Sequence, residues 1–388
     1  MHTSLPNGRD TRARLRSGAV AAALAVCGAL LATAESARAA DDTRAAAAQL
    51  IESLGLHVAP QPVRERPGWR PPRVILVGKN RELHQLLPEL QQAAPAARLV
   101  EISAATSRDI AEADAAIGLC SPEVLSKATH LAWIQWGAAG VEHCVQQPVV
   151  RARRLLITNT QRTAAPSMAE HVLALMLALS RHLPAFLHEQ QGRHWLDWDD
   201  VATLTDLDGK TVLVVGLGGI GTEVARRAHA LGMRVIATRA SGHTGPDYVS
   251  YVGLPDELLK LTREADYVVN CVPLTPQTTA IFNREFFATM KRSAYFISVG
   301  RGRSTVTADL VAALGNGTIA GAGLDVVDPE PLPADSPLWR APNLIITPHI
   351  SADTPAALAN YSLLLRENLR RYVAGEPMLS VVDVERGY

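Results

Sequence analysis

Three glycines near the middle of the chain have the spacing of a nucleotide-binding turn. Gly216, Gly218 and Gly221 form G-x-G-x-x-G directly after the apolar run 211–215. In a strand–turn–helix unit, the first glycine allows a tight turn, the second lets the backbone approach a pyrophosphate, and the third allows close helix packing. The free N–H groups at the start of the helix bind the phosphates. The predicted dinucleotide site comprises Gly216, Gly218, Gly219, Ile220 and Gly221.

An arginine stands where such a site usually carries an acid. In NAD-binding units, an acidic residue about 20 residues after the glycines binds the ribose hydroxyls. Here Arg239 ends the next apolar run, followed by Ser241 and His243 as further donors. A guanidinium suits a 2′-phosphate, so we expect NADP(H) to be preferred, although use of NAD(H) is also compatible with the sequence. The alternative is an arginine that is merely solvated at a strand end.

Apolar runs typical of strands alternate with helical stretches along the chain. One series occupies residues 73–77, 98–102, 114–118, 131–135 and 155–158, and a second occupies 211–215, 234–238, 267–272, 295–299, a short segment ending near Leu324, and 344–347. This alternation predicts an α/β fold with two doubly wound parallel sheets covered by helices. We expect a flavodoxin-like substrate domain, residues 73–160 and 349–388, interrupted by a Rossmann NAD(P)-binding domain, residues 161–348. The apolar helix predicted over 165–183 suits packing between domains or subunits, and we expect a homodimer.

Composition restricts the class of partner. The chain has 388 residues with 38 Lys and Arg against 38 Asp and Glu. A formal net charge of zero argues against a nucleic-acid-binding protein. The four cysteines form no C-x-x-C pair, so we expect no metal site and interpret them as small buried side chains. They are Cys27, Cys120, Cys144 and Cys271.

The N-terminus has the order typical of a secretory signal peptide. A basic segment precedes the apolar stretch 18–34, and small residues follow at Ala37 and Ala39. The apolar stretch is at the short limit for a membrane span. We therefore predict a signal peptide over residues 1–39, export to the periplasm and no stable membrane association after cleavage. A cytoplasmic protein with a disordered or mis-started N-terminus is the alternative, and the proline-rich residues 40–72 are predicted to be a linker.

Several motifs together resemble the D-isomer-specific 2-hydroxyacid dehydrogenase family, particularly its glyoxylate/hydroxypyruvate reductase-like members. They are AEHVLALMLAL, GLGGIG, NCVPLTPQTT, ISVGRGRSTVTADLVAALGNGTIAGAGLDVVDPEPLP and NLIITPHIS. The resemblance covers about residues 73–388. It implies an NAD(P)-dependent dehydrogenase that acts on a small 2-keto or 2-hydroxy acid, with glyoxylate or hydroxypyruvate expected.

The resemblance also implies three catalytic residues: Arg301 in SVGRGR, Glu330 in DPEP and His349 in TPHIS. Reduction of a 2-keto acid requires a hydride at the carbonyl carbon and a proton at its oxygen. A histidine can deliver that proton, and an adjacent carboxylate orients it. A guanidinium can bind carboxylate and carbonyl oxygens together. Arg301 and His349 follow apolar runs, at the strand ends where ligands collect in open α/β sheets.

Other positions take their expected roles from the same resemblance. On the cofactor side they are Val272 and Pro273 near the adenosine, Val299, Gly300 and His349 near the nicotinamide, and Asp325 at its amide. The loop WGAAGVE corresponds to the substrate-carboxylate loop, with Ala138, Ala139 and Gly140 expected to bind substrate beside Arg301. One departure is Ser298, where many family members have asparagine.

Two alternative functions stay open at this point. One is a nucleotide-sensing binding protein of the same fold with little turnover. The other is a related dehydrogenase acting on another anion, such as phosphite. Motif residues do not separate a sensor from an enzyme, because both can retain them.

Overall fold

The computed structural model describes residues 42–201 and 203–388. The chain forms two compact units, residues 1–53 and residues 54–388. In the first unit, the described residues 42–53 are helical. The predicted signal peptide, residues 1–39, lies outside the described residues. None of the helices that the structure describes is long and apolar enough to cross a membrane.

The first sheet of the second unit is parallel and has five strands in the order β3-β2-β4-β5-β6. The order 2-1-3-4-5 along the chain is that of flavodoxin-like folds. The strands are β2 (Val74–Val77), β3 (Arg98–Glu101), β4 (Ala115–Ile117), β5 (Trp133–Gln135) and β6 (Leu156–Thr158). One face packs against α2 (Arg81–Ala93) and α13 (Pro355–Ala374). The other packs against α3 (Ser107–Glu112), α4 (Pro122–Lys127), α5 (Glu142–Val145) and α6 (Pro148–Ala152).

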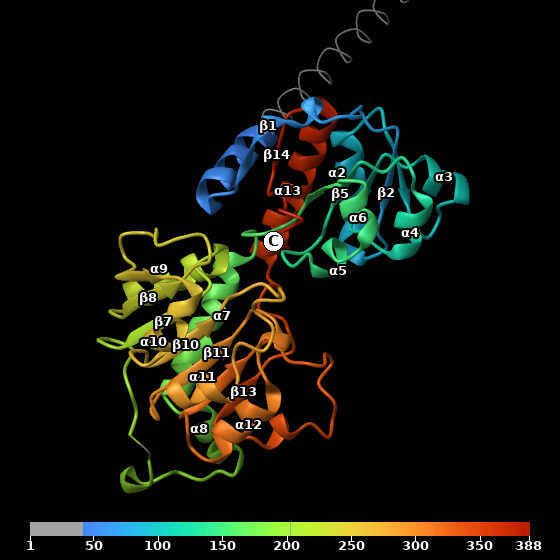
Figure 1. Ribbon diagram of the computed structural model, residues 1–388. Coiled ribbons are helices and arrows are strands. Elements are labelled where there is room, and N and C mark those ends of the chain that lie inside the picture. The colour runs from blue at the N-terminus through green and yellow to red at the C-terminus, as the bar shows by residue number, and fades with distance from the viewer. Residues whose placement is uncertain (1–41, 202) are drawn as a thin grey trace, which may run out of the picture. The chain divides into compact units, whose positions relative to one another are not determined.

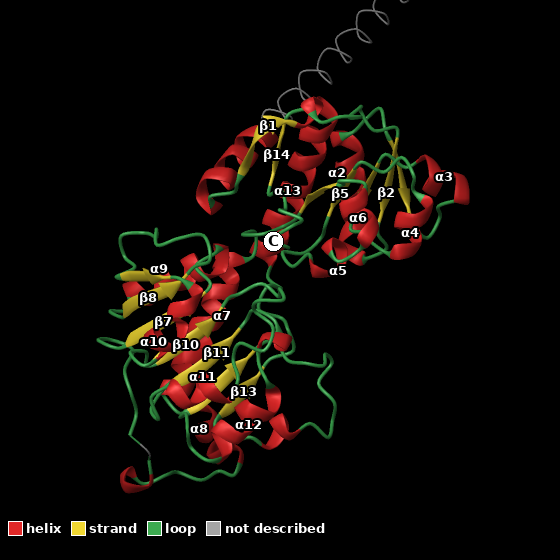
Figure 2. Cartoon of the chain, in the orientation of Figure 1, coloured by secondary structure: helices red, strands yellow, loops and turns green. Residues whose placement is uncertain are grey.

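The second sheet is parallel with seven strands in the order β13-β12-β11-β10-β7-β8-β9, visible as yellow arrows in Figure 2. This is the Rossmann order with one further strand. The strands are β7 (Thr211–Val215), β8 (Arg234–Thr238), β9 (Tyr251–Gly253), β10 (Tyr267–Asn270), β11 (Tyr295–Ser298), β12 (Gly321–Leu324) and β13 (Leu344–Ile346). Helices α7 (Ala165–Ser180) and α9 (Gly219–Ala230) cover one face (Figure 1). Helices α10 (Leu258–Thr262), α11 (Arg284–Thr289) and α12 (Thr307–Gly315) cover the other.

The chain order confirms the predicted α/β fold with an inserted Rossmann domain. The chain leaves the five-stranded sheet after β6, and α13 returns to pack beside α2 on that sheet. The apolar stretch 165–183 forms α7 followed by α8 (Leu183–Gln191). The remaining helices are short 3-10 turns: η1 (Val63–Glu65), η2 (Trp198–Asp200), η3 (Pro255–Glu257), η4 (Gly302–Ser304) and η5 (Pro337–Arg340).

Part of the predicted linker is a strand instead. β1 (Val58–Pro62) pairs antiparallel with β14 (Pro377–Leu379), with Val58 opposite Leu379. The prolines that suggested a linker are tolerated here, because a two-stranded sheet consists only of edge strands. The short strand β9 was not predicted either, since three residues give too little alternation to detect.

The interpretation of the cysteines is corrected for one pair. Cys120 and Cys144 form a disulfide across 24 residues of sequence, and no spacing rule predicts such a pair. The bond joins the segment before α4 to α5, the helix that begins with Glu142. Cys271 carries a free thiol, and burial raises its pKa to about 12.

Candidate active site

The glycine turn between β7 and α9 has the shape that a dinucleotide requires. Gly216 has a φ of +96°, a region that favours glycine. A Cβ on Gly221 would overlap the carbonyl oxygen of Gly216, so helix and strand can approach only without a side chain there. At Gly218, no described heavy atom beyond its chain neighbours lies within 4 Å of the Cβ position. The residues therefore fit a pyrophosphate lying against the backbone at the start of α9.

Arg239 lies directly beside this turn. It follows Thr238, the last residue of β8, whose carbonyl accepts a hydrogen bond from the Gly216 N–H at 3.1 Å. The Nη1 of Arg239 donates to the carbonyl of Thr244 at 3.0 Å, which holds the guanidinium across its loop. A cation is therefore placed where a ribose or its 2′-phosphate would lie. The further donors expected in this loop, Ser241 and His243, are exposed.

The imidazole of His349 and the carboxylate of Glu330 are in contact. Glu330 Oε2 lies 2.8 Å from His349 Nδ1, while its Oε1 accepts from the backbone N–H of Val327 at 3.0 Å. A carboxylate at Nδ1 selects the tautomer protonated there and leaves Nε2 to exchange a proton. His349 has a left-handed backbone with a φ of +53°. Both side chains are partly exposed, at 43% and 35%, as a group that meets substrate must be.

Asp325 fixes the loop that carries His349. Its Oδ1 accepts from the hydroxyl of Thr347 at 2.6 Å and from the N–H of Ile350 at 3.0 Å, and its Oδ2 accepts from the N–H of Ser351 at 3.1 Å. Burial raises the pKa of Asp325, but the hydrogen bonds from Ser351 and Thr347 bring it below its ordinary value. The buried carboxylate is therefore ionised and braces both sides of the histidine. His171 on α7, which sequence reasoning missed, lies 3.0 Å from the Thr347 hydroxyl through its Nε2.

Arg301, just after β11, contacts the predicted substrate loop. Its Nε donates to Glu142 Oε1 at 2.7 Å, and its Nη1 donates to the carbonyl of Gly300 at 2.8 Å. A Cβ on Gly140 would overlap the guanidinium, so a glycine is required at that point of the loop. Burial raises the pKa of Glu142, and the Arg301 guanidinium brings it below the ordinary value. Sequence reasoning missed Glu142, because nothing in its local pattern indicates a partner 159 residues away.

The backbone of the substrate loop is braced through its carbonyls. The Nδ2 of Asn159 donates to the Ala139 carbonyl at 2.8 Å, and the indole of Trp136 donates to the Gly140 carbonyl at 2.7 Å. The Thr160 N–H donates to the Ala138 carbonyl at 3.3 Å. Because the carbonyls are bonded inward and both alanines are exposed, the loop holds a fixed shape at the surface.

A buried amide supports the segment before Arg301. The Nδ2 of Asn270 donates to the hydroxyls of Ser298 and Ser304 at 3.0 and 2.8 Å, and Ser304 in turn donates to the Arg301 carbonyl at 2.6 Å. Ser298, the departure from the usual asparagine, is thus an acceptor in this network. A Cβ on Gly300 would lie 2.8 Å from the Val272 carbonyl oxygen, so these two predicted cofactor residues are adjacent. Val299 is buried and Pro273 is exposed.

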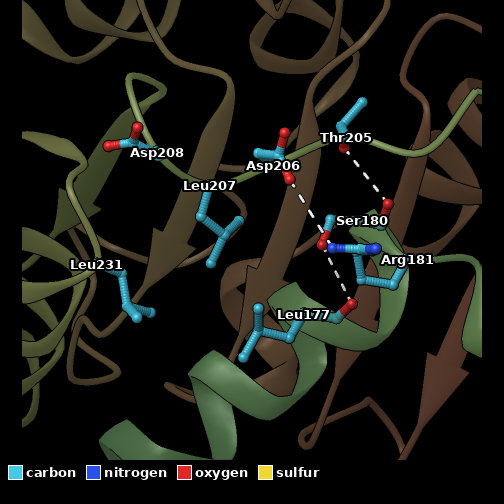
Figure 3. Close-up of a pocket in the computed structure, with 8 residues that line it drawn as sticks. All are labelled: Leu177, Ser180, Arg181, Thr205, Asp206, Leu207, Asp208 and Leu231. Atoms are coloured by element: carbon cyan, nitrogen blue, oxygen red, sulfur yellow. Dashed lines mark hydrogen bonds and ion pairs between the residues drawn. The ribbon is translucent and has the colours of Figure 1, made fainter.

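The structure thus brings the predicted residues into three groups: the glycine turn with Arg239, the pair His349 and Glu330, and Arg301 with the loop around Gly140. All follow the carboxyl ends of strands or the loops beyond them. A surface hollow elsewhere, drawn in Figure 3, lies near the amino end of β7 and contains none of these residues. Among the described residues, no group of three or more His, Cys, Asp or Glu is arranged to hold a metal ion.

Comparison with known proteins agrees with this geometry. The family model for the NAD binding domain of D-isomer specific 2-hydroxyacid dehydrogenases matches residues 173–351. The human glyoxylate reductase/hydroxypyruvate reductase is 33% identical over 248 residues, which are 63% of this chain and 74% of that protein. The chain belongs to the D-isomer specific 2-hydroxyacid dehydrogenase family. It is therefore an NAD(P)-dependent oxidoreductase.

Solved structures of this dehydrogenase family are similar over most of the chain. A probable 2-hydroxyacid dehydrogenase from Rhizobium etli, solved with NADP, HEPES and tartaric acid, has a TM-score of 0.72 at 27% identity and covers 81% of this chain and 99% of that one. The NADPH-dependent glyoxylate/hydroxypyruvate reductase of Sinorhizobium meliloti, solved with NADP and sulfate, has a TM-score of 0.70 at 27% identity, covering 81% and 100%.

Proposed function

We propose that this dehydrogenase reduces glyoxylate or hydroxypyruvate with NADPH. The observation that carries the proposal is the 2.8 Å contact between His349 Nδ1 and Glu330 Oε2 in a chain of this family. The pair supplies a proton donor whose tautomer is fixed, and Arg301 supplies a cation for the substrate carboxylate. Relatives with the reductase name, including the human protein and a Klebsiella pneumoniae protein at 35% identity, support the substrate class.

The proposed roles follow from the chemistry of each group. A bound nicotinamide supplies the hydride. Arg301 binds the substrate carboxylate and carbonyl oxygens, with backbone N–H groups of Ala138 and Ala139 as further donors. Glu330 stabilises the positive charge of the protonated His349 imidazole. His349 Nε2 then gives its proton to the carbonyl oxygen of the substrate. In the oxidative direction, the same nitrogen takes the proton back.

We propose NADP(H) as the preferred dinucleotide. Arg239 can bind a 2′-phosphate through charge-assisted hydrogen bonds, whereas an acid at this position would repel it. Two similar solved structures contain NADP, which agrees with this preference. The domain of residues 73–160 and 349–388 would supply the substrate loop and His349, whereas the domain of residues 161–348 would bind the dinucleotide and supply Arg301 and Glu330 to the substrate.

We further propose that the protein is a homodimer. The segment after α7 exposes large apolar side chains that a monomer would leave in water: Leu183, Leu187, Trp195 and Trp198. Trp195 and Trp198 are more than nine-tenths exposed, at 91% and 94%. Exposed apolar clusters of this kind are typical of subunit contacts. Sedimentation of the wild type beside W195D/W198D tests this proposal, with a shift to monomer expected in the variant.

Export to an oxidising compartment is also proposed. The predicted signal peptide is one argument, and the disulfide between Cys120 and Cys144 is a second, because such bonds are rare in cytosolic proteins. The alternative of a cytoplasmic protein requires both thiols to be kept reduced. Fractionation with N-terminal sequencing decides between them.

A turnover assay tests the central proposal. Purified protein is given NADPH or NADH with glyoxylate, hydroxypyruvate, other 2-keto acids and phosphite. We expect the highest kcat/KM with NADPH and glyoxylate or hydroxypyruvate. Nucleotide binding without turnover on any substrate favours the sensor alternative, and activity only on a non-carboxylate anion favours the other dehydrogenase alternative.

A further inference from the structure

The side chain of Arg162, just before α7, covers the start of α9. Its Cγ would lie 2.6 Å from a Cβ built on Gly219, so the arginine stem fills the space that a side chain at position 219 would take. Its backbone has a φ of +74°, a conformation that disfavours residues with a side chain. Its Nη1 donates to the carbonyl of Leu54 at 3.2 Å. The chain thus holds the stem of Arg162 against the glycine turn in an unfavourable backbone conformation, with the guanidinium anchored at the Leu54 carbonyl.

The charges around Arg162 favour an anion. Burial and the nearby guanidinium of Arg239 lower the pKa of Arg162, whereas Glu223 acts in the opposite direction. Two guanidinium groups are therefore within electrostatic reach of each other at a partly buried site. Glu223 is already paired with Arg226 and Arg227 on its own helix. An anion bound between the two cations would relieve their repulsion.

We propose that Arg162 binds the pyrophosphate of the dinucleotide, while Arg239 binds the 2′-phosphate. The proposal rests on the proposed function, since it assigns a residue to the same cofactor site. The two arginines are assigned different phosphates because they lie at different places along the cofactor site. The stem of Arg162 lies against Gly219, at the start of α9. The free N–H groups of this helix end are where a pyrophosphate is expected to bind. Arg239 lies at the end of β8, where the adenosine ribose is expected.

The affinities for NADPH and NADH, measured by fluorescence titration without substrate, test this assignment. R162Q keeps part of the stem and removes the charge, whereas R162G also relaxes the left-handed backbone, so its fold is not at risk from strain. We expect both variants to weaken NADPH and NADH binding alike, by about ten- to a hundredfold, and R162K to retain most of the affinity. Binding by both charge-removed variants should also depend less on salt than in the wild type.

A matched control removes a charge of the same kind elsewhere. Arg234 is at the opposite end of β8 and pairs with Glu264 at 2.8 Å. R234Q should leave both affinities unchanged. A second variant tests the contact itself. The methyl group of G219A would displace the Arg162 stem, so G219A should weaken binding in the wild type and have little further effect in R162G.

The possible results separate this assignment from the proposed function. Wild-type protein that binds both dinucleotides, with R162Q equal to it in affinity and melting temperature, overturns the role of Arg162 alone. A loss confined to NADPH overturns the pyrophosphate assignment and moves Arg162 to the 2′-phosphate. If G219A and R162G weaken dinucleotide binding additively, the contact between position 219 and the Arg162 stem is not the cause of the G219A effect. Wild-type protein that binds neither dinucleotide contradicts the proposed function together with this inference.

Discussion

The guanidinium of Arg301 is held by the carboxylate of Glu142, with Nε 2.7 Å from Oε1. The contact joins the segment after β11 to the first residue of α5, and both side chains are mostly buried, at 27% and 14% exposure. With Nε bonded to Glu142 and Nη1 bonded to the Gly300 carbonyl, the plane of the guanidinium is fixed before any substrate arrives. Glu142 is thus a positioning residue for Arg301.

Removal of the Glu142 charge should therefore misplace Arg301 without removing it. We expect E142Q to lower kcat/KM for the keto acid by roughly a hundredfold, because a shift of about 1 Å in a positioned group can have that effect. The KM for NADPH should change little, and E142D should recover part of the loss. The control is E112Q, which removes an exposed partner of Arg108 on α3. An unchanged kcat/KM in E142Q would mean that Gly140 and Gly300 alone orient Arg301.

His349 is the proposed proton donor. H349A should lower kcat by about a hundred- to ten-thousandfold, which is the range for loss of a general acid, while NADPH affinity measured without substrate stays close to that of the wild type. E330Q should lower kcat less than H349A, because the imidazole is present but no longer beside a charge. The double variant should be no worse than H349A, since the two residues act as one unit. Additive losses in steady-state kinetics would contradict that coupling.

Asp325 gives a prediction with a defined pH dependence. Its native pKa lies below the ordinary value of 3.8. A carboxylate whose pKa is lowered by folding stabilises the native state above its unfolded pKa, and that contribution is lost as the pH falls through the native pKa. We expect D325N to melt at a lower temperature than wild type at pH 7, and the difference to shrink below pH 3.8.

Melting curves between pH 7 and pH 3 check this expectation, with the exposed Asp335 as control. D335N should melt like wild type throughout. A difference between D325N and wild type that stays constant with pH would assign the effect to lost hydrogen-bond geometry rather than to charge.

Thiol counts test the disulfide and the signal peptide together. The chain has four cysteines, and cleavage after residue 39 removes Cys27. The mature protein should then show one reactive thiol when unfolded without reductant, that of Cys271, and three after reduction of the bond between Cys120 and Cys144. In the native state, Cys271 should react slowly, because its raised pKa leaves little thiolate at neutral pH. Two thiols before reduction and four after it would indicate an uncleaved chain with the same disulfide.

Local sequence patterns were sufficient to predict the strands and the turn of the dinucleotide site. The runs predicted at 211–215 and 234–238 are the observed β7 and β8, because a parallel strand covered on both faces is largely apolar. The glycine spacing then located the turn, since Gly216 is required by its positive φ and Gly221 by its close approach to the Gly216 carbonyl, both of which are local to the turn.

Contacts between distant segments could not be predicted in this way. Arg301 meets Glu142 because the loop near residue 140 lies against the end of β11. Cys120 meets Cys144 because α5 packs near β4. Asp325 was assigned to the cofactor by resemblance, and its hydrogen bonds to Ile350 and Ser351 depend on the path of a loop 25 residues later. Residue types suggest what each group can bind, but only tertiary structure selects the partner.

Arg239 should decide which dinucleotide the protein prefers. A hydrogen bond to a charged group contributes about 1.5–3 kcal/mol, and each 1.4 kcal/mol is about tenfold in affinity. R239A should therefore weaken the binding of NADPH by roughly ten- to a hundredfold and barely change the binding of NADH. R239D should go further, because a carboxylate repels the 2′-phosphate and accepts bonds from the ribose hydroxyls. The measurement is the ratio of kcat/KM for NADPH and NADH, with R234D at the other end of β8 as the matched charge reversal. A wild type that prefers NADH, or an R239D ratio equal to that of wild type, would reduce Arg239 to a cation that only bonds the Thr244 carbonyl.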